Sequence, residues 1–146
     1  MTGFSNGGVM TYAYACARSE RLAAIGPMAG SNLDQCSPER PLSLLHQHSD
    51  SDPVVPYYGG IAIGRIVTSK DFPEVPASVG RWATDAGCAP EPERSDGVSE
   101  VEQIEWTGCP DGIEVRLVRV PGRGHNWLNK GDYDPLDEVL RFFSIA

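Results

Sequence analysis

A serine between two glycines stands almost at the first residue of the chain, where Gly3, Ser5 and Gly7 form the pattern Gly-x-Ser-x-Gly. Between a strand and a helix, this pattern holds a serine on a strained turn with its hydroxyl exposed, and the glycines give the turn room. Residues 9–18 contain no glycine or proline and predict the helix. Only two residues stand before Gly3, so no preceding strand is expected. The pattern is therefore either accidental or part of the carboxyl-terminal half of a larger protein.

An aspartate and a histidine follow this serine in the order that nucleophilic catalysis would use. Asp52 comes after a short apolar run, and His125 lies in a glycine-rich loop after the last apolar run. An imidazole takes the serine proton and returns it to the leaving group, while a carboxylate fixes the imidazole tautomer and stabilises its charged form. Taken singly, Asp52 is also a turn aspartate before proline and His125 a loop histidine. The order Ser5, Asp52, His125 is that of α/β-hydrolases and favours a serine hydrolase.

A metal site is the rival interpretation of the middle of the chain. Residues 46–51 read His-Gln-His-Ser-Asp-Ser, which approaches the His-x-His-x-Asp-His pattern of zinc-dependent hydrolases. Ser51 replaces the closing histidine, and three histidines in the whole chain are too few for a two-metal site. We therefore expect no metal and no cofactor, and we interpret His46 and His48 as strand-end histidines that shape a pocket.

The apolar patterns that must position these residues predict an α/β domain over residues 1–146. Buried strands are expected within 21–30 and at 42–48, two alternating strands at 101–106 and 113–120, and helices at 9–18, 74–87 and 134–143. Residues 107–112 are expected to join the last two strands as a hairpin, and the acidic segment 89–99 to be exposed. We expect a mostly parallel sheet flanked by helices, with ligands bound beyond the carboxyl ends of its strands and without the strands that precede the nucleophile.

Composition argues against two classes of partner. The formal net charge is -8, and no basic run offsets it, whereas nucleic-acid binding needs a basic surface. No apolar stretch approaches the length of a membrane span, and no secretory signal is visible at Met1. The sequence does not fix the oligomeric state.

Four cysteines favour an oxidising compartment. They lack the close Cys-x-x-Cys spacing of zinc sites, and an even number in loop-like surroundings favours two disulfides over four free thiols. Four cysteines allow three connectivities, and the residues alone do not choose between them.

Several blocks of the chain resemble one family, the secreted esterases grouped with polyhydroxybutyrate depolymerases and feruloyl or acetylxylan esterases. The similar blocks are distributed over the whole chain and are residues 2–8, 23–30, 46–48, 52–57, 75–82, 124–127 and 142–143. The spacer blocks match as well as the three candidate catalytic residues, which makes the resemblance specific.

This resemblance implies an α/β-hydrolase fold and a carboxylic ester hydrolase that works through an acyl-enzyme. Ser5 would be the nucleophile, Asp52 the orienting acid and His125 the general base. The family also implies an extracellular setting and a substrate that is a polyhydroxyalkanoate or a phenolic or acetyl ester of the plant wall. Further implied roles are oxyanion or substrate binding by the Asn6 N–H, His48 and Trp127, and disulfides Cys88–Cys109 and Cys16–Cys36.

The chain departs from this family in the turn before Asp52. Ser49 replaces a usual glycine, and Asp50 and Ser51 stand where smaller or less charged residues are usual. Asp50 is therefore a second candidate partner for His125. The alternative to an active esterase is a catalytically silent remnant or binding surface, because a chain that begins at the nucleophile would lack a second oxyanion donor.

Overall fold

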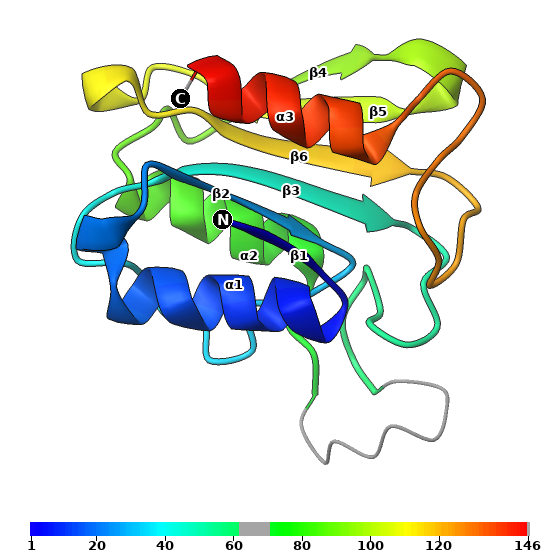
Figure 1. Ribbon diagram of the computed structural model, residues 1–146, viewed down its shortest axis with the longest axis horizontal. Coiled ribbons are helices and arrows are strands. Elements are labelled where there is room, and N and C mark those ends of the chain that lie inside the picture. The colour runs from blue at the N-terminus through cyan, green and yellow to red at the C-terminus, as the bar shows by residue number, and fades with distance from the viewer. Residues whose placement is uncertain (62–70, 146) are drawn as a thin grey trace.

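The computed structural model describes residues 1–61 and 71–145, which build a six-stranded mixed sheet with the order β1-β2-β3-β6-β5-β4 (Figure 1). The first four strands in this order run parallel, and β5 and β4 are antiparallel to their neighbours. The bounds are β1 Thr2–Phe4, β2 Ala24–Met28, β3 Ser43–Ser49, β4 Glu93–Asp96, β5 Glu102–Trp106 and β6 Val115–Val120. The expected α/β sheet is confirmed at this level.

Helices cover both faces of the sheet. The helices α1 (Asn6–Ala17) and α2 (Val75–Asp85) pack on one face, and α3 (Pro135–Ile145), drawn in orange and red, packs on the other (Figure 1). Successive side chains of a strand point to opposite faces, so each face has its own apolar cluster. In β3, Leu44 belongs to the cluster under α1 and α2, while Leu45 belongs to the cluster under α3.

Most predicted elements are confirmed, with small shifts at their ends. The first helix begins at Asn6, directly after Ser5, and β2, β3, β5, β6, α2 and α3 lie within or close to the predicted ranges. The strand β4 falls in the acidic segment 89–99, where exposure was expected but no strand. All four of its residues are exposed at the sheet edge, so it has no alternating apolar pattern that would reveal it.

The expectation that no strand precedes Ser5 is wrong. Thr2–Phe4 forms β1, in which Thr2 pairs with Gly26 and Phe4 with Met28 of β2. The Met1 carbonyl accepts the Gly26 N–H at 2.8 Å, which extends this parallel ladder to the first residue. A three-residue strand is too short to show a periodic pattern, and its partner strand, rather than its own sequence, stabilises it.

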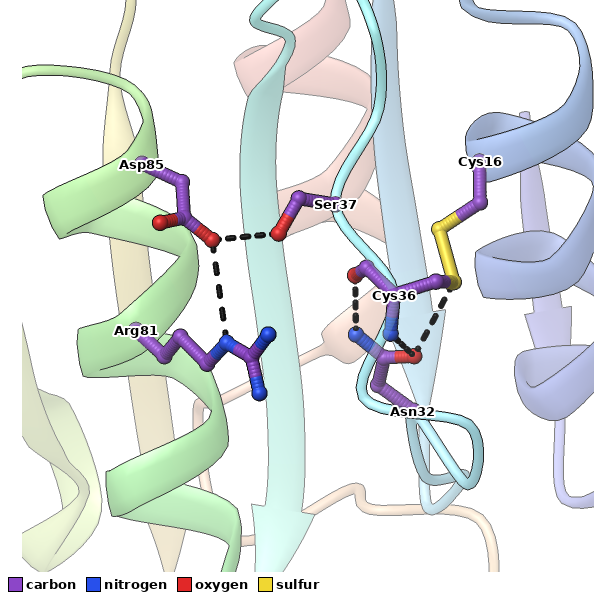
Figure 2. Close-up of a disulfide and its surroundings, with 6 residues drawn as sticks. All are labelled: Cys16, Asn32, Cys36, Ser37, Arg81 and Asp85. Atoms are coloured by element: carbon purple, nitrogen blue, oxygen red, sulfur yellow. Dashed lines mark hydrogen bonds and ion pairs between the residues drawn. A yellow bond between two sulfur atoms is a disulfide. The ribbon is translucent and has the colours of Figure 1, made fainter.

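Both implied disulfides are present. Cys16 in the last turn of α1 is bonded to Cys36 in the loop after β2, and Cys88 after α2 is bonded to Cys109 after β5. Asn32 fixes the first loop, because its side-chain amide donates to the Cys36 carbonyl at 2.8 Å and its oxygen accepts the Cys36 N–H at 3.2 Å (Figure 2).

Among the described helices, none has both the length and the apolar character needed to cross a membrane.

Candidate active site

Ser5 occupies the turn between β1 and α1 in a strained backbone conformation. Its φ of 55° and ψ of -116° place a non-glycine residue in a region that side chains disfavour. The surrounding glycines allow this turn, because a Cβ on Gly3 would lie 2.5 Å from the Gly7 carbonyl carbon. The helix also approaches the end of β2 closely at Gly8, where a Cβ would lie 3.0 Å from the Met28 carbonyl oxygen, whereas a Cβ on Gly7 meets no atom within 4 Å. Steric room is thus needed at Gly3 and Gly8.

Three residues from distant parts of the chain form a continuous line of hydrogen bonds. The Ser5 Oγ lies 2.8 Å from His125 Nε2, and His125 Nδ1 lies 2.7 Å from Asp52 Oδ2. A carboxylate only accepts, so His125 Nδ1 carries the proton and Nε2 presents a lone pair to the serine hydroxyl. This is the tautomer in which an imidazole can take the serine proton.

Asp52 is a buried carboxylate with several donors. Its Oδ1 accepts the backbone N–H groups of Val54 and Val55, each at 2.8 Å. Burial acts to raise the pKa of Asp52, but hydrogen bonds from His48, His125 and these two N–H groups outweigh it and hold the pKa below its ordinary value. Asp52 is therefore ionised at neutral pH and can stabilise a charged His125.

A chain of buried polar side chains ends beside this carboxylate. Tyr12 Oη lies 2.7 Å from His46 Nδ1, His46 Nε2 lies 2.9 Å from His48 Nδ1, and His48 Nε2 lies 2.8 Å from the Val55 carbonyl oxygen. The carbonyl only accepts, so each group in the chain donates to the next. His48 Nε2 also lies 3.5 Å from Asp52 Oδ2. This line of hydrogen bonds thus places the His48 Nε2–H beside the Asp52 carboxylate.

Burial keeps Tyr12 and His46 uncharged. It lowers the pKa of His46 well below the ordinary histidine value, and the neighbouring His48 lowers it further. It also raises the pKa of Tyr12 above the ordinary tyrosine value. The ring nitrogens of His46 and His48 are committed to protein partners, and within the described residues no group of three or more metal-ligating side chains is arranged around an ion site.

A cleft of about 390 Å³ opens at Ser5. Asn6, the first residue of α1, also lines it, and the first N–H groups of a helix have no acceptor within the helix. The other lining residues are apolar and come from four separate segments: Val9, Leu33, Val54, Val55 and Phe72. Sequence reasoning missed all five, because ordinary apolar residues far apart in the chain carry no local signal of a shared wall.

Two residues expected at the substrate site, His48 and Trp127, are not among the residues that line this cleft. His48 is fully buried behind Asp52, so it does not reach the cleft. Trp127 is 46% exposed, and its ring lies 5.8 Å from that of Phe4, outside the residues that line the cleft. Phe4 in turn lies 5.2 Å from the His125 ring. Trp127 therefore packs against Phe4, which in turn contacts the His125 ring.

Asp50 does not compete for His125. Its Oδ2 accepts hydrogen bonds from Arg119 at 2.7 and 3.2 Å, and its Oδ1 accepts the Gly122 N–H at 3.0 Å. The Arg119 guanidinium and the Gly122 N–H hold this carboxylate, and Asp52 is the carboxylate that meets the imidazole.

Comparison with known proteins reveals similarity to feruloyl esterases, although no protein-family model matches the chain. It is 43% identical over 148 residues to a probable feruloyl esterase C of Aspergillus terreus, 32% over 115 residues to feruloyl esterase C of Emericella nidulans and 30% over 151 residues to feruloyl esterase D of Neurospora crassa. These matches cover 99%, 78% and 98% of this chain, but 49%, 42% and 46% of the relatives. The chain spans about half the length of these relatives and is a homologue of feruloyl esterases over most of its own length.

Proposed function

We propose that residues 1–146 are a catalytic domain of α/β-hydrolase type that hydrolyses carboxylic esters with Ser5, His125 and Asp52. The observation that carries this proposal is the pair of hydrogen bonds at 2.8 and 2.7 Å that joins the three side chains in the required order and tautomer. The strained turn at Ser5 and the similarity to feruloyl esterases support it independently.

The geometry suits a two-step reaction through an acyl-enzyme. Ser5 Oγ attacks the ester carbonyl carbon while His125 Nε2 takes the hydroxyl proton. The carbonyl oxygen becomes an oxyanion near the N–H of Asn6, and His125 then gives its proton to the departing alcohol. Water attacks the acyl-enzyme with His125 again as the base, which releases the carboxylic acid and restores Ser5.

The cleft favours an ester with an aromatic acyl group. Its walls are aliphatic side chains and Phe72, which offer a ring apolar contact without a charged partner. The relatives are named feruloyl esterases, so a hydroxycinnamic ester is the substrate class that both observations support. Two disulfides also favour an oxidising compartment such as the extracellular space.

The direct test is hydrolysis of the methyl ester of ferulic acid by the purified chain. We expect turnover that Ser5→Ala lowers at least about 10³-fold, because the variant loses the nucleophile. Ser144→Ala, an exposed serine of α3, is the matched control and should keep the wild-type rate. Turnover that survives Ser5→Ala would contradict the proposal.

A further inference from the structure

The backbone ladder between β3 and β6 stops before it reaches the catalytic residues. Its last paired residues are Ser49 and Val120. Asp52 follows Ser49 by three positions and His125 follows Val120 by five, so both lie in loops beyond the sheet. The sheet therefore does not fix the distance between these two side chains, and some other contact must do so.

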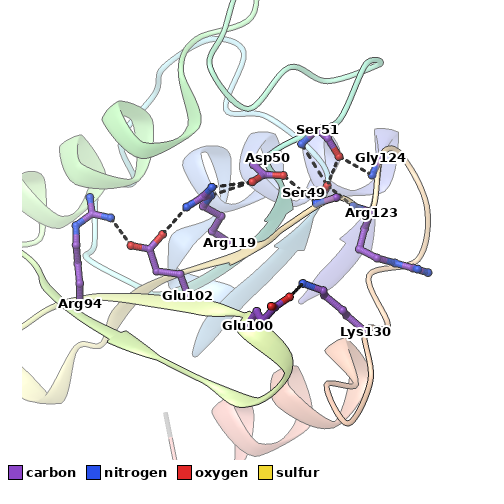
Figure 3. A network of polar contacts seen from close by, with 11 residues as sticks. Ser49, Asp50, Ser51, Arg94, Glu100, Glu102, Arg119, Arg123, Gly124 and Lys130 are labelled. Carbon is purple, nitrogen blue, oxygen red and sulfur yellow. Dashed lines mark hydrogen bonds and ion pairs between the residues drawn. The ribbon is translucent and has the colours of Figure 1, made fainter.

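Three successive side chains supply such contacts (Figure 3). Ser49 Oγ accepts the Arg123 N–H at 3.0 Å, Asp50 Oδ1 accepts the Gly122 N–H at 3.0 Å, and Ser51 Oγ accepts the Gly124 N–H at 3.1 Å. We call these three hydrogen bonds the 49–51 clamp. On one side the clamp ends directly before Asp52, and on the other it ends directly before His125.

The acceptors of the clamp are themselves held in place. Arg119 Nη2 donates to Asp50 at 2.7 Å, and Arg119 Nη1 donates to Glu102 of β5 at 3.1 Å. Figure 3 shows this line of charges continuing from Glu102 to Arg94. The hydroxyls of Ser49 and Ser51 lie 3.2 Å apart, so one donates a hydrogen bond to the other. Asp50 is therefore anchored to two strands, and the serines support each other.

Besides the clamp, the Asn126 side-chain amide donates to the Arg123 carbonyl oxygen at 3.0 Å within the same loop. Gly122 and Arg123 are exposed, and Gly122 and Gly124 adopt left-handed φ values of 73° and 60°. Glycine adopts this conformation without strain but also leaves it easily. Polar contacts from residues 49–51, rather than apolar packing, thus select one conformation of the segment.

We propose that Ser49, Asp50 and Ser51 are positioning residues, which hold the backbone of residues 122–124 so that His125 meets both Asp52 and Ser5. This inference rests on the proposed function for its effect on turnover. A displacement of about 1 Å at a catalytic group can cost about 10²-fold in rate. Loss of one clamp contact should therefore lower kcat while KM changes little.

Ser49→Ala tests the buried contact, and the chain offers a closely matched control. Ser43, at the opposite end of the same strand, is also buried, and its Oγ accepts the Glu114 N–H at 3.1 Å before β6 begins. We expect Ser49→Ala to lower kcat for the ferulate ester about 10-fold or more, with KM within about twofold, while Ser43→Ala leaves both within about twofold.

Asp50 gives a second variant that does not disturb a fully buried site. Asp50→Asn keeps an oxygen that can accept the Gly122 N–H, whereas Asp50→Ala removes it. The clamp requires Asp50→Ala to lower kcat more than Asp50→Asn does. Equal effects of the two variants would show that the charge facing Arg119 matters and the contact with the loop does not, which would overturn the role of Asp50.

Hydrogen exchange of backbone N–H groups, followed by NMR, tests the clamp without any enzymatic turnover. Ser49→Ala should accelerate exchange at Arg123 by about fivefold or more, whereas Ser43→Ala should accelerate exchange at Glu114 instead. A wild-type chain without esterase activity would defeat the proposed function only. Unchanged exchange at residues 122–124 in Ser49→Ala, or a wild-type kcat in an active enzyme, would overturn the clamp.

Discussion

Tyr12 in α1 donates a hydrogen bond of 2.7 Å to His46 Nδ1 in β3, and this contact begins the buried chain that ends beside the Asp52 carboxylate. The two residues are 34 positions apart and are both almost completely inaccessible to solvent. The contact ties the helix that follows the Ser5 turn to the strand that precedes the Asp52 turn. It therefore links two loops of the candidate site through the core.

Removal of the Tyr12 hydroxyl should destabilise the fold. Tyr12→Phe leaves a buried acceptor on His46 without its donor, and an unsatisfied buried group costs about 1–3 kcal/mol. Urea unfolding of Tyr12→Phe, compared with that of Tyr14→Phe, isolates this cost, because Tyr14 is a partly buried tyrosine two residues further along α1. Equal unfolding free energies for the two variants would show that the chain of hydrogen bonds does not contribute to stability.

The pH dependence of stability should report the neutral state of His46. Its pKa in the folded protein is well below the ordinary value of 6.5, so the unfolded chain takes up a proton first as the pH falls. The free energy of unfolding should be fully retained above about pH 6.5 and decline below it, by up to about 1.4 kcal/mol per pH unit from this group.

His46→Gln is the matched variant for this prediction, because an amide can replace both hydrogen bonds but takes up no proton. The slope of unfolding free energy against pH between about pH 6.5 and 4 should be smaller in His46→Gln than in the wild type. Below about pH 4 the depressed pKa of Asp52 adds a second loss of stability, because its hydrogen bonds favour the ionised carboxylate. Parallel curves between pH 6.5 and 4 would contradict a neutral buried His46.

The two glycines after Ser5 should respond differently to substitution. Gly8→Ala forces a Cβ to 3.0 Å from both the Gly30 Cα and the Met28 carbonyl oxygen, so we expect a loss of about 1–3 kcal/mol. Gly7→Ala places its Cβ in open space on a helix and should be neutral or stabilising by up to about 1 kcal/mol. Thermal unfolding of both variants checks the contrast, which would be refuted by a Gly7→Ala loss as large as that of Gly8→Ala.

The candidate catalytic residues and most elements could be predicted because each leaves a local trace. A serine turn needs its glycines, and buried strands such as β2 and β3 need continuous apolar residues. The order of Ser5, Asp52 and His125 added a constraint that single motifs lack. The strand β1 was missed because its partner strand stabilises it, and the cleft was missed because its walls come from separate segments.

His48 shows the limit of a sequence pattern most clearly. The resemblance to the esterase family implied contact between His48 and substrate. Alternation in β3 instead turns it to the face under α1 and α2, together with Leu44 and His46. In the folded chain Tyr12 packs against His46 and Tyr57 packs against His48, and both histidines are closed to solvent.

The disulfides should differ in their effect on the cleft. Each closes a loop of about 20 residues and should contribute about 3 kcal/mol to the free energy of unfolding. The Cys16–Cys36 bond also fixes the loop that carries Leu33 on the cleft wall, while Cys88–Cys109 follows β5 at the opposite end of the sheet. Double serine variants should both lower stability in urea, and only Cys16→Ser/Cys36→Ser should raise KM. A higher KM in Cys88→Ser/Cys109→Ser would contradict this division.

Covalent labelling by an aryl phosphonate ester tests most directly whether Ser5 is an activated nucleophile. The phosphorus takes the place of the ester carbonyl carbon, and peptide mapping by mass spectrometry locates the adduct. The hydrogen bonds from Ser5 to His125 and from His125 to Asp52 predict one adduct per chain, on Ser5, formed much more slowly in His125→Asn and absent in Ser5→Ala. Labelling that continues unchanged in folded Ser5→Ala, or that falls on other serines of the wild-type chain, would contradict the account.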